Sequence, residues 1–413
     1  MSALNYVIIG NSAAAVGCIE GIRSVDREGG ITVVSDEPYH VYARPLISYL
    51  LYGKTDEERM KYRPDDFYKK NGVKIILGVR AEKVDYGRKA VQLAGGDSIP
   101  FDRLLIATGS RPFVPPMEGL DGVEKKFSFM TLDDAKALGK AVTKTSRVLI
   151  IGAGLIGLKC AEGIRDRAGS IEVVDLADRI LPSILDEEGS AMVQKYIESK
   201  GIRFHLGDSV EKFSPNGALL KSGKQLSFDV LVVAVGVRPN TQLAADIGCK
   251  IGRGIAIDER SATSLPNVWA AGDCCECLDI ADGKERILAI LPNAYLQGET
   301  AGVNMAGGDK RFDNAIPMNA IGFFGLHVIT AGSYDGEAWV HKSEQDYKKL
   351  VTKDNLLKGF ILIGNVARAG IYTSLIRERT PLDTIDYELI REKPQLMAFT
   401  RENRAVRLGG AKS

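Results

Sequence analysis

Runs of consecutive apolar residues, each closed by a small residue or glycine, mark the first part of the chain. Residues 6–9 and 31–35 are expected as strands on either side of a helix at 13–24, and 101–107 as a later strand ending at Thr108-Gly109-Ser110. Short continuous apolar runs are typical of strands buried on both faces of a parallel sheet. The pattern therefore predicts a βαβ unit, a long excursion and a return to the same sheet.

The same plan repeats further along the chain. The repeat is expected to contain strands at 147–151, 171–175 and 229–235 and a helix at 155–167. After it come another apolar strand, 268–273, and a helix rich in small residues at about 294–306. Because pieces of the first plan lie on both sides of the second, the second unit is expected to be inserted into the first.

From about residue 316 the pattern changes to alternation of apolar and polar residues. It runs through 328–340, 347–351 and 359–363, which predicts an antiparallel sheet, and a helical stretch follows from Arg368. The predicted class is thus α/β, with two Rossmann-like dinucleotide-binding domains, the second inserted in the first, plus a C-terminal α+β domain. The expected boundaries are 1–112 and 241–315 for the two parts of the first domain, 113–240 for the second domain and 316–413 for the third.

Two copies of one phosphate-binding signature support this plan. The first copy, VIIGNSAAAVG, has Gly10, Ser12 and Ala15 at the three glycine positions, and the second, VLIIGAGLIG, has Gly152, Gly154 and Gly157. The first position allows a tight turn, the second allows close approach of a pyrophosphate, and the third allows close packing of helix on strand. Backbone N–H groups at the helix start then face the phosphates. Two matches predict two bound dinucleotides.

Charge and composition narrow the class of protein to which this chain can belong. Basic and acidic residues nearly cancel, 54 against 53, so no net field favours nucleic acid or an anionic membrane. No apolar run approaches the roughly 20 residues that cross a bilayer, and the first strand begins too close to Met1 for a signal peptide. We expect a cytoplasmic protein. The six cysteines and four histidines predict no metal site; buried structural thiols are favoured over a redox role, although Cys274, Cys275 and Cys277 adjoin an expected cofactor loop.

Acidic residues follow both glycine loops at the distance where a ribose is bound. Asp36 lies about 20 residues after the first loop and is the favoured ribose ligand, with Glu37 as the alternative. Asp175 holds the equivalent place after the second loop, where a carboxylate pairs with a free 2′-hydroxyl and repels a 2′-phosphate. NADH is therefore expected over NADPH, although nearby Arg179 softens the discrimination.

The ordered motifs resemble the FAD-dependent pyridine-nucleotide-disulfide oxidoreductase superfamily, and more narrowly its rubredoxin reductase and NADH nitrite reductase flavin-subunit branch. Besides the two loops, the resemblance is carried by 36–38, 42–48, Ala107-Thr108-Gly109, Gly236-Val237-Arg238-Pro239-Asn240 and Ala270-Ala271-Gly272-Asp273. It implies FAD on the first loop, NAD(H) on the inserted domain and an interface role, in a homodimer, for the C-terminal domain. It further implies cofactor contacts for Arg44, Pro45, Thr108, Gly109, Gly236, Gly272, Asp273 and Asn293, with Asp273 on the flavin ribityl chain.

Two departures from the family pattern shape the expected chemistry. Disulfide-reducing and peroxide-reducing relatives carry a redox cysteine near the Arg44-Pro45 segment, but residues 38–53 contain none, so electrons should leave directly from the flavin. Arg44, or less strongly His40, is expected beside the isoalloxazine. Many relatives also have a lysine and a glutamate where this chain has Tyr49 and Lys159. Lys159 is expected either to place a positive charge near the flavin or to be a solvated helix residue, and Glu162 to be a helix-surface acid.

The resemblance therefore implies an enzyme that passes electrons from NADH through FAD to a small redox protein, such as rubredoxin or a ferredoxin, or to the siroheme and iron–sulfur part of a nitrite-reductase-like complex. Alternatives stay open. They are an NADH oxidase, a disulfide or persulfide reductase that uses Cys274 to Cys277, and a redox-responsive binding protein that holds NADH and FAD.

Overall fold

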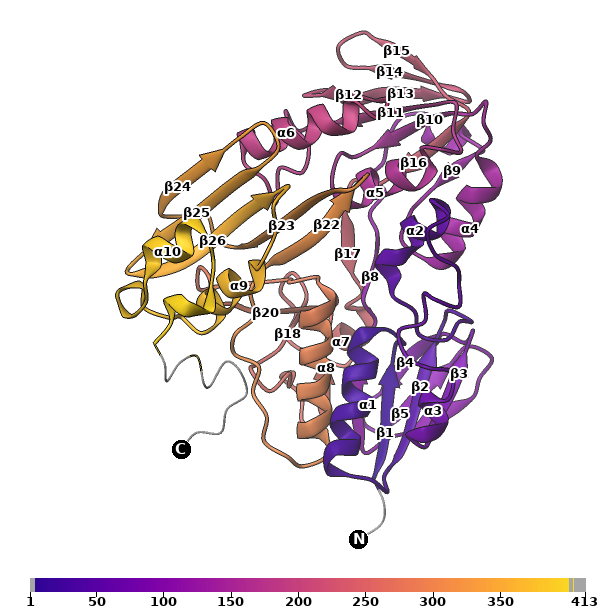
Figure 1. Ribbon diagram of the computed structural model, residues 1–413. Coiled ribbons are helices and arrows are strands. Elements are labelled where there is room, and N and C mark those ends of the chain that lie inside the picture. The colour runs from indigo at the N-terminus through magenta and orange to yellow at the C-terminus, as the bar shows by residue number, and fades with distance from the viewer. Residues whose placement is uncertain (1–3, 401–403, 405–413) are drawn as a thin grey trace. The chain divides into compact units, whose positions relative to one another are not determined.

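The computed structural model describes residues 4–400 and 404, and the chain divides into two compact units (Figure 1). Unit 1 contains Met1–Ser183, Gln194–Cys277 and Arg286–Phe312, and unit 2 contains Ile184–Val193, Leu278–Glu285 and Asp313–Ser413. The boundaries expected from the sequence do not separate 184–193 and 278–285 from the dinucleotide-binding domains. Residues 401–403 and 405–413 of the expected third domain lie outside the described residues.

The first sheet of unit 1 has five parallel strands. Their order is β19 (Val268–Ala270), β7 (Arg103–Ile106), β1 (Asn5–Ile9), β2 (Gly30–Ser35) and β3 (Val73–Leu77). The central strands are almost completely buried, as their apolar runs predict. β19 returns to this sheet after the whole second copy of the plan, so the insertion predicted from the sequence is confirmed.

The second sheet of unit 1 repeats the arrangement with five parallel strands. Their order is β12 (Ile202–Leu206), β11 (Ser170–Asp175), β10 (Arg147–Ile151), β16 (Val230–Val233) and β9 (Lys126–Phe127). Helix α5 (Leu155–Ile164) follows β10 and ends before the expected residue 167, because the chain must turn to begin β11 at Ser170. β8 (Ser110–Pro112) and β17 (Val237–Pro239) form a two-stranded antiparallel ribbon. β8 follows β7, and β17 follows β16, before the chain returns to the first sheet.

Smaller elements complete unit 1. Two three-stranded antiparallel sheets are formed by β4 (Ala81–Asp85), β5 (Ala90–Leu93) and β6 (Ser98–Pro100), and by β13 (Val210–Ser214), β14 (Gly217–Leu220) and β15 (Gln225–Ser227). β18 (Ile255–Ala256) pairs with β20 (Cys275–Asp279), and β21 (Lys284–Arg286) follows, β20 and β21 each being divided between the two units. The helices are α1 (Ala13–Val25), α2 (Ile47–Leu51), α3 (Phe67–Lys70), α4 (Leu132–Ala141), α6 (Glu187–Glu198), α7 (Gln242–Asp246) and α8 (Leu291–Met305), α6 being shared between the units.

Helices α1 and α8 pack side by side with their backbones in contact (Figure 1). Glycines make this possible: a Cβ on Gly17 would lie 2.2 Å from the carbonyl oxygen of Tyr295, and one on Gly298 would lie 2.0 Å from that of Ala14. Gly21 and Gly302 repeat the arrangement one turn further along. Because α8 follows the second copy of the plan in sequence, this contact joins chain segments far apart along the protein.

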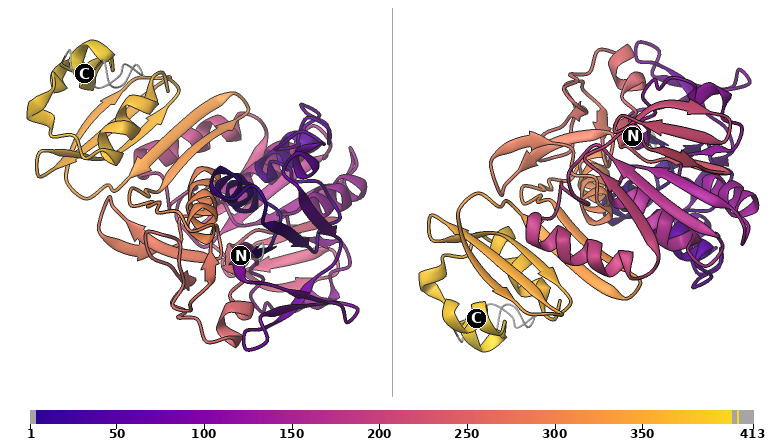
Figure 2. Two further views of the ribbon diagram at one scale, coloured as in Figure 1. Left: turned by 90° about the horizontal axis from the view of Figure 1, so that it is seen from below. Right: turned by 90° about the horizontal axis from the view of Figure 1, so that it is seen from above.

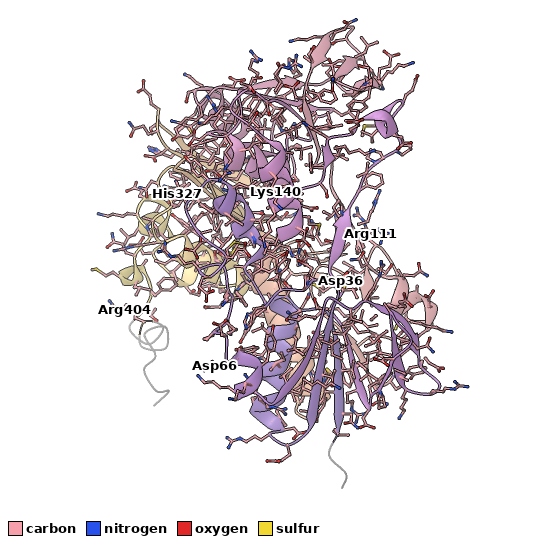
Figure 3. All side chains as sticks on the ribbon, turned by 90° about the vertical axis from the view of Figure 1, so that its right-hand side faces the viewer. Asp36, Asp66, Arg111, Lys140, His327 and Arg404 are labelled. Carbon is pink, nitrogen blue, oxygen red and sulfur yellow. The ribbon has the colours of Figure 1, made fainter. Side chains whose placement is uncertain are left out.

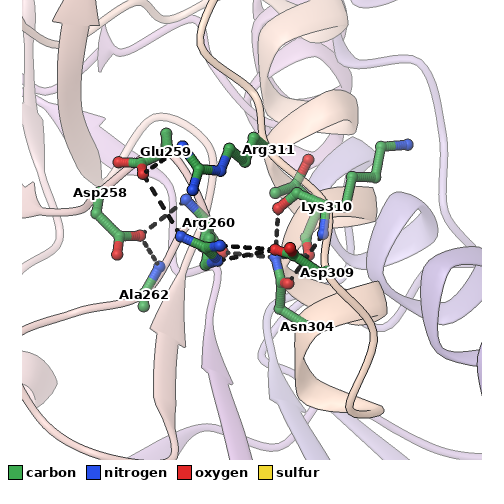
Figure 4. A network of polar contacts seen from close by, with 9 residues as sticks. Asp258, Glu259, Arg260, Ala262, Asn304, Asp309, Lys310 and Arg311 are labelled. Atoms are coloured by element: carbon green, nitrogen blue, oxygen red, sulfur yellow. Dashed lines mark hydrogen bonds and ion pairs between the residues drawn. The ribbon is translucent and has the colours of Figure 1, made fainter.

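A polar network fixes the end of α8 to a neighbouring turn (Figure 4). The amide of Asn304 donates to the carbonyl oxygens of Arg260, at 3.2 Å, and Lys310, at 2.8 Å, and its oxygen accepts from the N–H of Lys310. The guanidinium of Arg260 pairs with Asp309 at 2.7 Å near the surface. One amide therefore satisfies backbone groups of two loops that would otherwise lack partners.

Unit 2 is built on a five-stranded antiparallel sheet. Its order is β22 (Met318–Phe323), β23 (Leu326–Gly332), β26 (Leu356–Ile363), β25 (Tyr347–Lys353) and β24 (Glu337–Lys342). The expected alternating stretch 328–340 is thus two strands separated at 333–336. Helices α9 (Ala369–Arg377) and α10 (Tyr387–Glu392) cover one face of the sheet (Figures 1 and 2), where Tyr372, Leu375 and Ile390 join its apolar core.

Candidate functional site

The two glycine loops share one backbone geometry. Gly10 has φ +113° and Gly152 has φ +112°, and each N–H donates to the neighbouring strand, at Val34 and Val174, over 2.8 Å. A Cβ on Gly10 would lie 2.1 Å from the carbonyl oxygen of Ala107, and one on Gly152 would lie 2.3 Å from that of Ala234. Both positions therefore require glycine, for the backbone angle and for the space.

The second and third positions of each signature lie where the following helix begins. Ser12 and Gly154 are the residues that precede α1 and α5, and neither start has a side-chain cap. The first N–H groups of both helices are thus left for an external acceptor, and a phosphate suits them. A Cβ on Gly157 would lie 2.0 Å from the carbonyl oxygen of Gly152, whereas Ala15 fits completely buried at the equivalent place.

Arg44 connects several residues expected at the flavin. It stands at the start of a 3₁₀ turn, Arg44–Leu46, that includes Pro45, and its guanidinium forms an ion pair with Glu37 and a 3.2 Å hydrogen bond to the carbonyl oxygen of Met130. Burial alone would lower the pKa of Arg44, but Tyr42 and Glu37 hold it above its ordinary value. Arg44 therefore carries a fixed positive charge.

Asp273 lies close enough to Arg44 for the two charges to interact. Burial raises the pKa of the Asp273 carboxyl, and Arg44 partly opposes the rise. The preceding Gly272, at φ +84°, donates its N–H to Oε1 of Gln297 over 2.8 Å, and Asn293 is fully buried in the first turn of α8. Within the described residues, no hydrogen bond reaches the Asp273 carboxylate.

These features fit FAD. The half-buried Asp273 carboxylate accepts no hydrogen bond from the described residues, and ribityl hydroxyl groups would supply the missing hydrogen bonds. The loop at Gly10, the small residues at the start of α1 and the helix start beside Asn293 leave room for backbone approach to a pyrophosphate and for the helix dipole to face a ring that gains negative charge. Gly10, Ser12, Ala15, Gly272, Asp273 and Asn293 are the residues that would hold it.

The two acids after β2 have separate surroundings. The Glu37 carboxylate accepts from Tyr42 Oη over 2.6 Å in addition to its pairing with Arg44. Asp36 is exposed at the end of the sheet, next to Glu37 (Figure 3). The favoured ribose ligand, Asp36, is thus the accessible one of the two, and Glu37 orients Arg44. His40, the alternative flavin neighbour, packs edge-on against Tyr68, whose hydroxyl donates to Asn11 of the glycine loop.

Asn240 ties the end of the ribbon to the Thr108-Gly109 turn. Its amide donates to the carbonyl oxygen of Thr108 over 2.9 Å, its N–H donates to that of Gly109 over 2.9 Å, and the Thr108 hydroxyl donates back to its carbonyl oxygen over 2.7 Å. Gly236, at φ +126°, directly precedes β17, and its carbonyl oxygen accepts from the N–H of Phe113. Thr108 and Gly109 are thereby held next to Ala107, which contacts the first glycine loop.

Asp175 stands at the end of β11 beside the second glycine loop. Its carboxylate accepts the N–H of Ala153, at 2.5 Å, and that of Ala177, at 2.8 Å. A carboxylate has about four acceptor positions, so ribose hydroxyls can still bind. Arg179 pairs with Asp178 at 2.9 Å. The place of Asp175 therefore suits the ribose contact expected from the sequence.

The positions of the family's lysine and glutamate are adjacent in space, although the residues differ. Lys159 Nζ lies 4.4 Å from the ring centroid of Tyr49, so a cation–π contact joins α5 to α2. Lys159 also pairs with Glu162, which is only 4% exposed. The expectation that Glu162 is a surface acid is wrong, because α2 packs against this face of α5 and covers it. Lys159 is correspondingly not a solvated helix residue.

The cysteines next to Asp273 are enclosed. Cys274 and Cys275 are buried, with their sulfur atoms 3.6 Å apart, and Cys277 is half-buried and accepts a hydrogen bond from Gln297. The neighbouring Cys275 lowers the pKa of Cys274, while burial raises that of Cys275. Cys274 and Cys277 have C-x-x-C spacing, but within the described residues no group of three or more His, Cys, Asp and Glu side chains could hold a metal.

Gln297 is a site residue that the sequence did not indicate, and Glu162 was expected on the helix surface and is instead buried. Gln297 lies one helical turn after Asn293, and its side chain links Gly272 to Cys277. A buried glutamine on a helix of small residues was the available signal. The burial of Glu162 had no comparable signal, because it depends on a segment that precedes it by more than 100 residues.

Two parallel sheets with paired glycine loops, Asp273 at the first cofactor site and Asp175 beside the second loop define a flavoprotein oxidoreductase that binds FAD and NAD(H). Residues 4–298 match the family model described as pyridine nucleotide-disulphide oxidoreductase, and residues 317–380 match the rubredoxin NAD+ reductase C-terminal domain. The chain belongs to the pyridine nucleotide-disulphide oxidoreductase family, and the predicted family, fold class, enzyme class and cofactors are confirmed.

Similar proteins support this assignment over most of the chain. The NADH-dependent phenylglyoxylate dehydrogenase subunit epsilon of Aromatoleum evansii is 32% identical over 91% of this chain and 92% of its own. An NADH oxidase of Methanocaldococcus jannaschii is 34% identical over 75% and 71%. The solved putidaredoxin reductase–putidaredoxin complex has a reductase of the same fold, with TM-score 0.87 and 24% identity over 94% of this chain and 96% of its own. Within the described residues, no helix has the length and apolar character needed to span a bilayer.

Proposed function

We propose that this enzyme passes electrons from NADH through FAD to a small redox protein such as a rubredoxin or a ferredoxin. One observation carries the proposal: the segment beside Asp273 is Arg44-Pro45, and 38–53 contains no cysteine. A thiol relay therefore has no nucleophile on that segment. The C-terminal match to a rubredoxin NAD+ reductase domain and the likeness to a reductase solved with its redox partner give further support.

The side chains and backbone groups of the protein bind FAD and NADH, orient them and shield them from water. When bound, FAD supplies a two-electron acceptor that can return electrons singly, which suits a junction between NADH and one-electron carriers. Arg44, fixed by Glu37, and the start of α8 place positive potential where charge develops. Lys159, on the helix after the second loop, contacts Glu162 and Tyr49. We propose that its positive charge favours the approach of the nicotinamide end of NADH.

Asp175 is proposed to set the preference for NADH. Replacing it in the variant Asp175→Ser should improve use of NADPH relative to NADH by roughly tenfold in kcat/KM, because repulsion of the 2′-phosphate is lost. Adding Arg179→Ala to the Asp175→Ser variant should reduce that gain. A ratio that stays at the wild-type value in Asp175→Ser would remove Asp175 from this role.

The deciding experiment is anaerobic reduction with NADH followed by separate additions of rubredoxin, ferredoxin, oxygen and a disulfide. Fast reoxidation of the flavin by a carrier, with slow reaction with oxygen, supports the proposal. Fast reaction with oxygen would instead support an NADH oxidase, which the similarity to the Methanocaldococcus jannaschii protein favours as the second candidate. Reoxidation only by the disulfide, lost in Cys274→Ala or Cys277→Ala, would overturn both.

Assembly and location belong to the same proposal. We propose a homodimer that uses the C-terminal domain, which light scattering of the purified holoenzyme would test. Six free cysteines, five of them buried, suit a reducing compartment such as the cytoplasm. Fractionation with an antibody against the native protein would test the location.

A further inference from the structure

Three arginines line one open groove of about 630 Å³ in unit 1. Arg111 comes from β8, Arg238 from β17, and Arg253 from the loop before β18. All three are exposed. Figure 3 labels Arg111 on the segment that leaves the first parallel sheet. No residue that we expect at FAD or NAD(H) lines this groove, although Arg238 and Pro239 belong to the motif that begins at Gly236.

Two of these charges face each other across the ribbon. Arg111 and Arg238 are direct partners in the antiparallel pairing of β8 with β17. Like charges directly opposite on a two-stranded ribbon repel and destabilise it. The Arg111 guanidinium donates to Asn240 Oδ1 over 3.0 Å, and that of Arg238 lies 4.4 Å from the ring centroid of Phe113. Neither contact neutralises a charge.

The third charge is held in place by its backbone. Glu276, a buried acid, accepts the N–H of Arg253 over 2.8 Å and that of Gly254 over 3.3 Å. Its carboxylate is therefore directed at the loop backbone. Among the described residues none of the three guanidinium groups forms an ion pair, and no acidic residue lines the groove.

The walls of the groove are apolar. Pro112, Phe113 and Pro239 lie between the arginines, and Phe113 offers a ring face. Guanidinium groups bind phosphate oxygens in bidentate fashion, and an apolar wall with an aromatic ring suits the sugar or base attached to a phosphate. The volume is sufficient for a ligand of nucleotide size, since small-molecule sites occupy roughly 300–1,000 Å³.

We propose that this groove is a binding site for a small diphosphate-bearing anion, separate from the FAD and NAD(H) sites. The diphosphate bridges Arg111, Arg238 and Arg253 and relieves the repulsion across the ribbon. Free pyrophosphate and a nucleoside diphosphate share this chemistry. The apolar wall should make the nucleoside diphosphate the tighter of the two.

The test is calorimetric titration of the holoenzyme with pyrophosphate and, separately, with ADP. FAD is bound and NAD+ is saturating throughout, so that both glycine loops are filled. Binding of one ligand per chain that weakens as NaCl rises is expected. The variant Arg253→Gln, which loses no side-chain contact, should weaken binding roughly tenfold, and Arg111→Gln should act similarly. ADP binding that exceeds pyrophosphate binding identifies the nucleotide as the source.

Arg88→Gln is the matched control, because Arg88 is an exposed arginine on the β4–β5 turn of the same unit. It should bind like the wild type. NADH-dependent flavin reduction should be unchanged in Arg253→Gln, which shows that the variant is folded. Absence of binding by the wild type, or equal binding by wild type and Arg253→Gln, would overturn the proposal. A Michaelis constant for an acidic electron carrier that rises in Arg253→Gln, without binding of either anion, would assign the groove to a protein partner instead.

Discussion

The helices after the two glycine loops carry a glutamate at the same position, but the two glutamates have different partners. Glu20 and Glu162 each lie ten residues after the first glycine of their loop. Glu20, on α1, pairs with Arg63 at 2.7 Å and accepts from Tyr295 at 2.6 Å, and both partners remain partly exposed. Glu162, on α5, pairs with Lys159 of its own helix under cover of α2. The acid at this position thus pairs with a distant segment in the first copy and with a lysine of its own helix in the second.

The wider surroundings follow the same contrast. The helix after the first loop is bordered by segments from far along the chain, because Gly272 and Ala294, at the start of α8, lie close to Ala14. Gly152 and Ala153 of the second loop are buried by segments of the second copy itself, which include Ala234, and Leu176, the residue after Asp175, is 73% exposed. The two cradles therefore differ in which parts of the chain surround them, and not in how deeply the loops are buried.

The largest effects should come from the loop glycines. Gly10→Val forces a side chain into the carbonyl of Ala107 and should yield protein that does not retain flavin. Gly152→Val should keep its flavin but weaken NADH binding by roughly 100-fold, or about 3 kcal/mol. Flavin absorbance after gel filtration and flavin reduction by NADH measure the two. Gly223→Val, with φ +86° in open space, controls for backbone strain alone. The reverse pattern, with flavin lost from Gly152→Val, would break the assignment of the loops.

The paired acids give the second test. Glu162→Gln removes the charge that pairs with the half-buried Lys159 and should lower the free energy of unfolding by about 2 kcal/mol. Glu20→Gln should cost about 1 kcal/mol, because Arg63 and Tyr295 keep access to water. Urea unfolding of the flavin-free proteins measures both. The double variant Lys159→Met with Glu162→Leu should recover most of the loss. Equal costs at the two positions would show that enclosure by α2 does not matter.

The sequence was sufficient for the central strands of both parallel sheets, the loops and the insertion, because continuous apolar runs and glycine spacing are local signals. It did not predict the edge strands β3, β9 and β12. It was sufficient for the order of the cofactor motifs as well. It could not show that Glu37 is used to hold Arg44, since two adjacent acids after β2 look alike until Tyr42 and Arg44 are placed. Nor could it show that 184–193 belongs to unit 2, where Asp186 accepts from Tyr347 and Lys349. Both facts depend on contacts between distant segments.

Asp273→Asn tests the surroundings of the first loop, because it should change protein stability and FAD affinity in opposite directions. The raised pKa of Asp273 means that the folded flavin-free protein binds this proton more tightly than the unfolded chain. The group's stabilising contribution is therefore complete below its ordinary pKa of about 3.9 and is lost as pH rises through the folded pKa. The flavin-free variant should then be more stable than the wild type at neutral pH, with a gap that closes as the pH falls toward 4, while FAD binds roughly tenfold more weakly.

Denaturant unfolding between pH 4 and 8 and fluorescence titration with FAD measure these two changes. Asp97→Asn, at an exposed turn, is the control and should change neither. A variant that is less stable than the wild type at neutral pH would show that the carboxylate has donors in the flavin-free protein. The proposed role of Asp273 on the ribityl chain would then lose its physical basis.

The smallest effect should come from the surface of the network at the end of α8 (Figure 4). Asp309 is 73% exposed in its pair with Arg260, so Asp309→Ala should lower the free energy of unfolding by about 0.5 kcal/mol, less at high salt. Asn304→Ala, a few residues away, should cost about 2 kcal/mol, because the carbonyl oxygens of Arg260 and Lys310 lose their partner. Both variants are compared by thermal unfolding of the holoenzyme. Since α8 also carries Asn293 and Gln297 at its other end, only Asn304→Ala should hasten flavin release. Loss of flavin from Asp309→Ala instead would mean that the surface pair, and not the amide, fixes the helix.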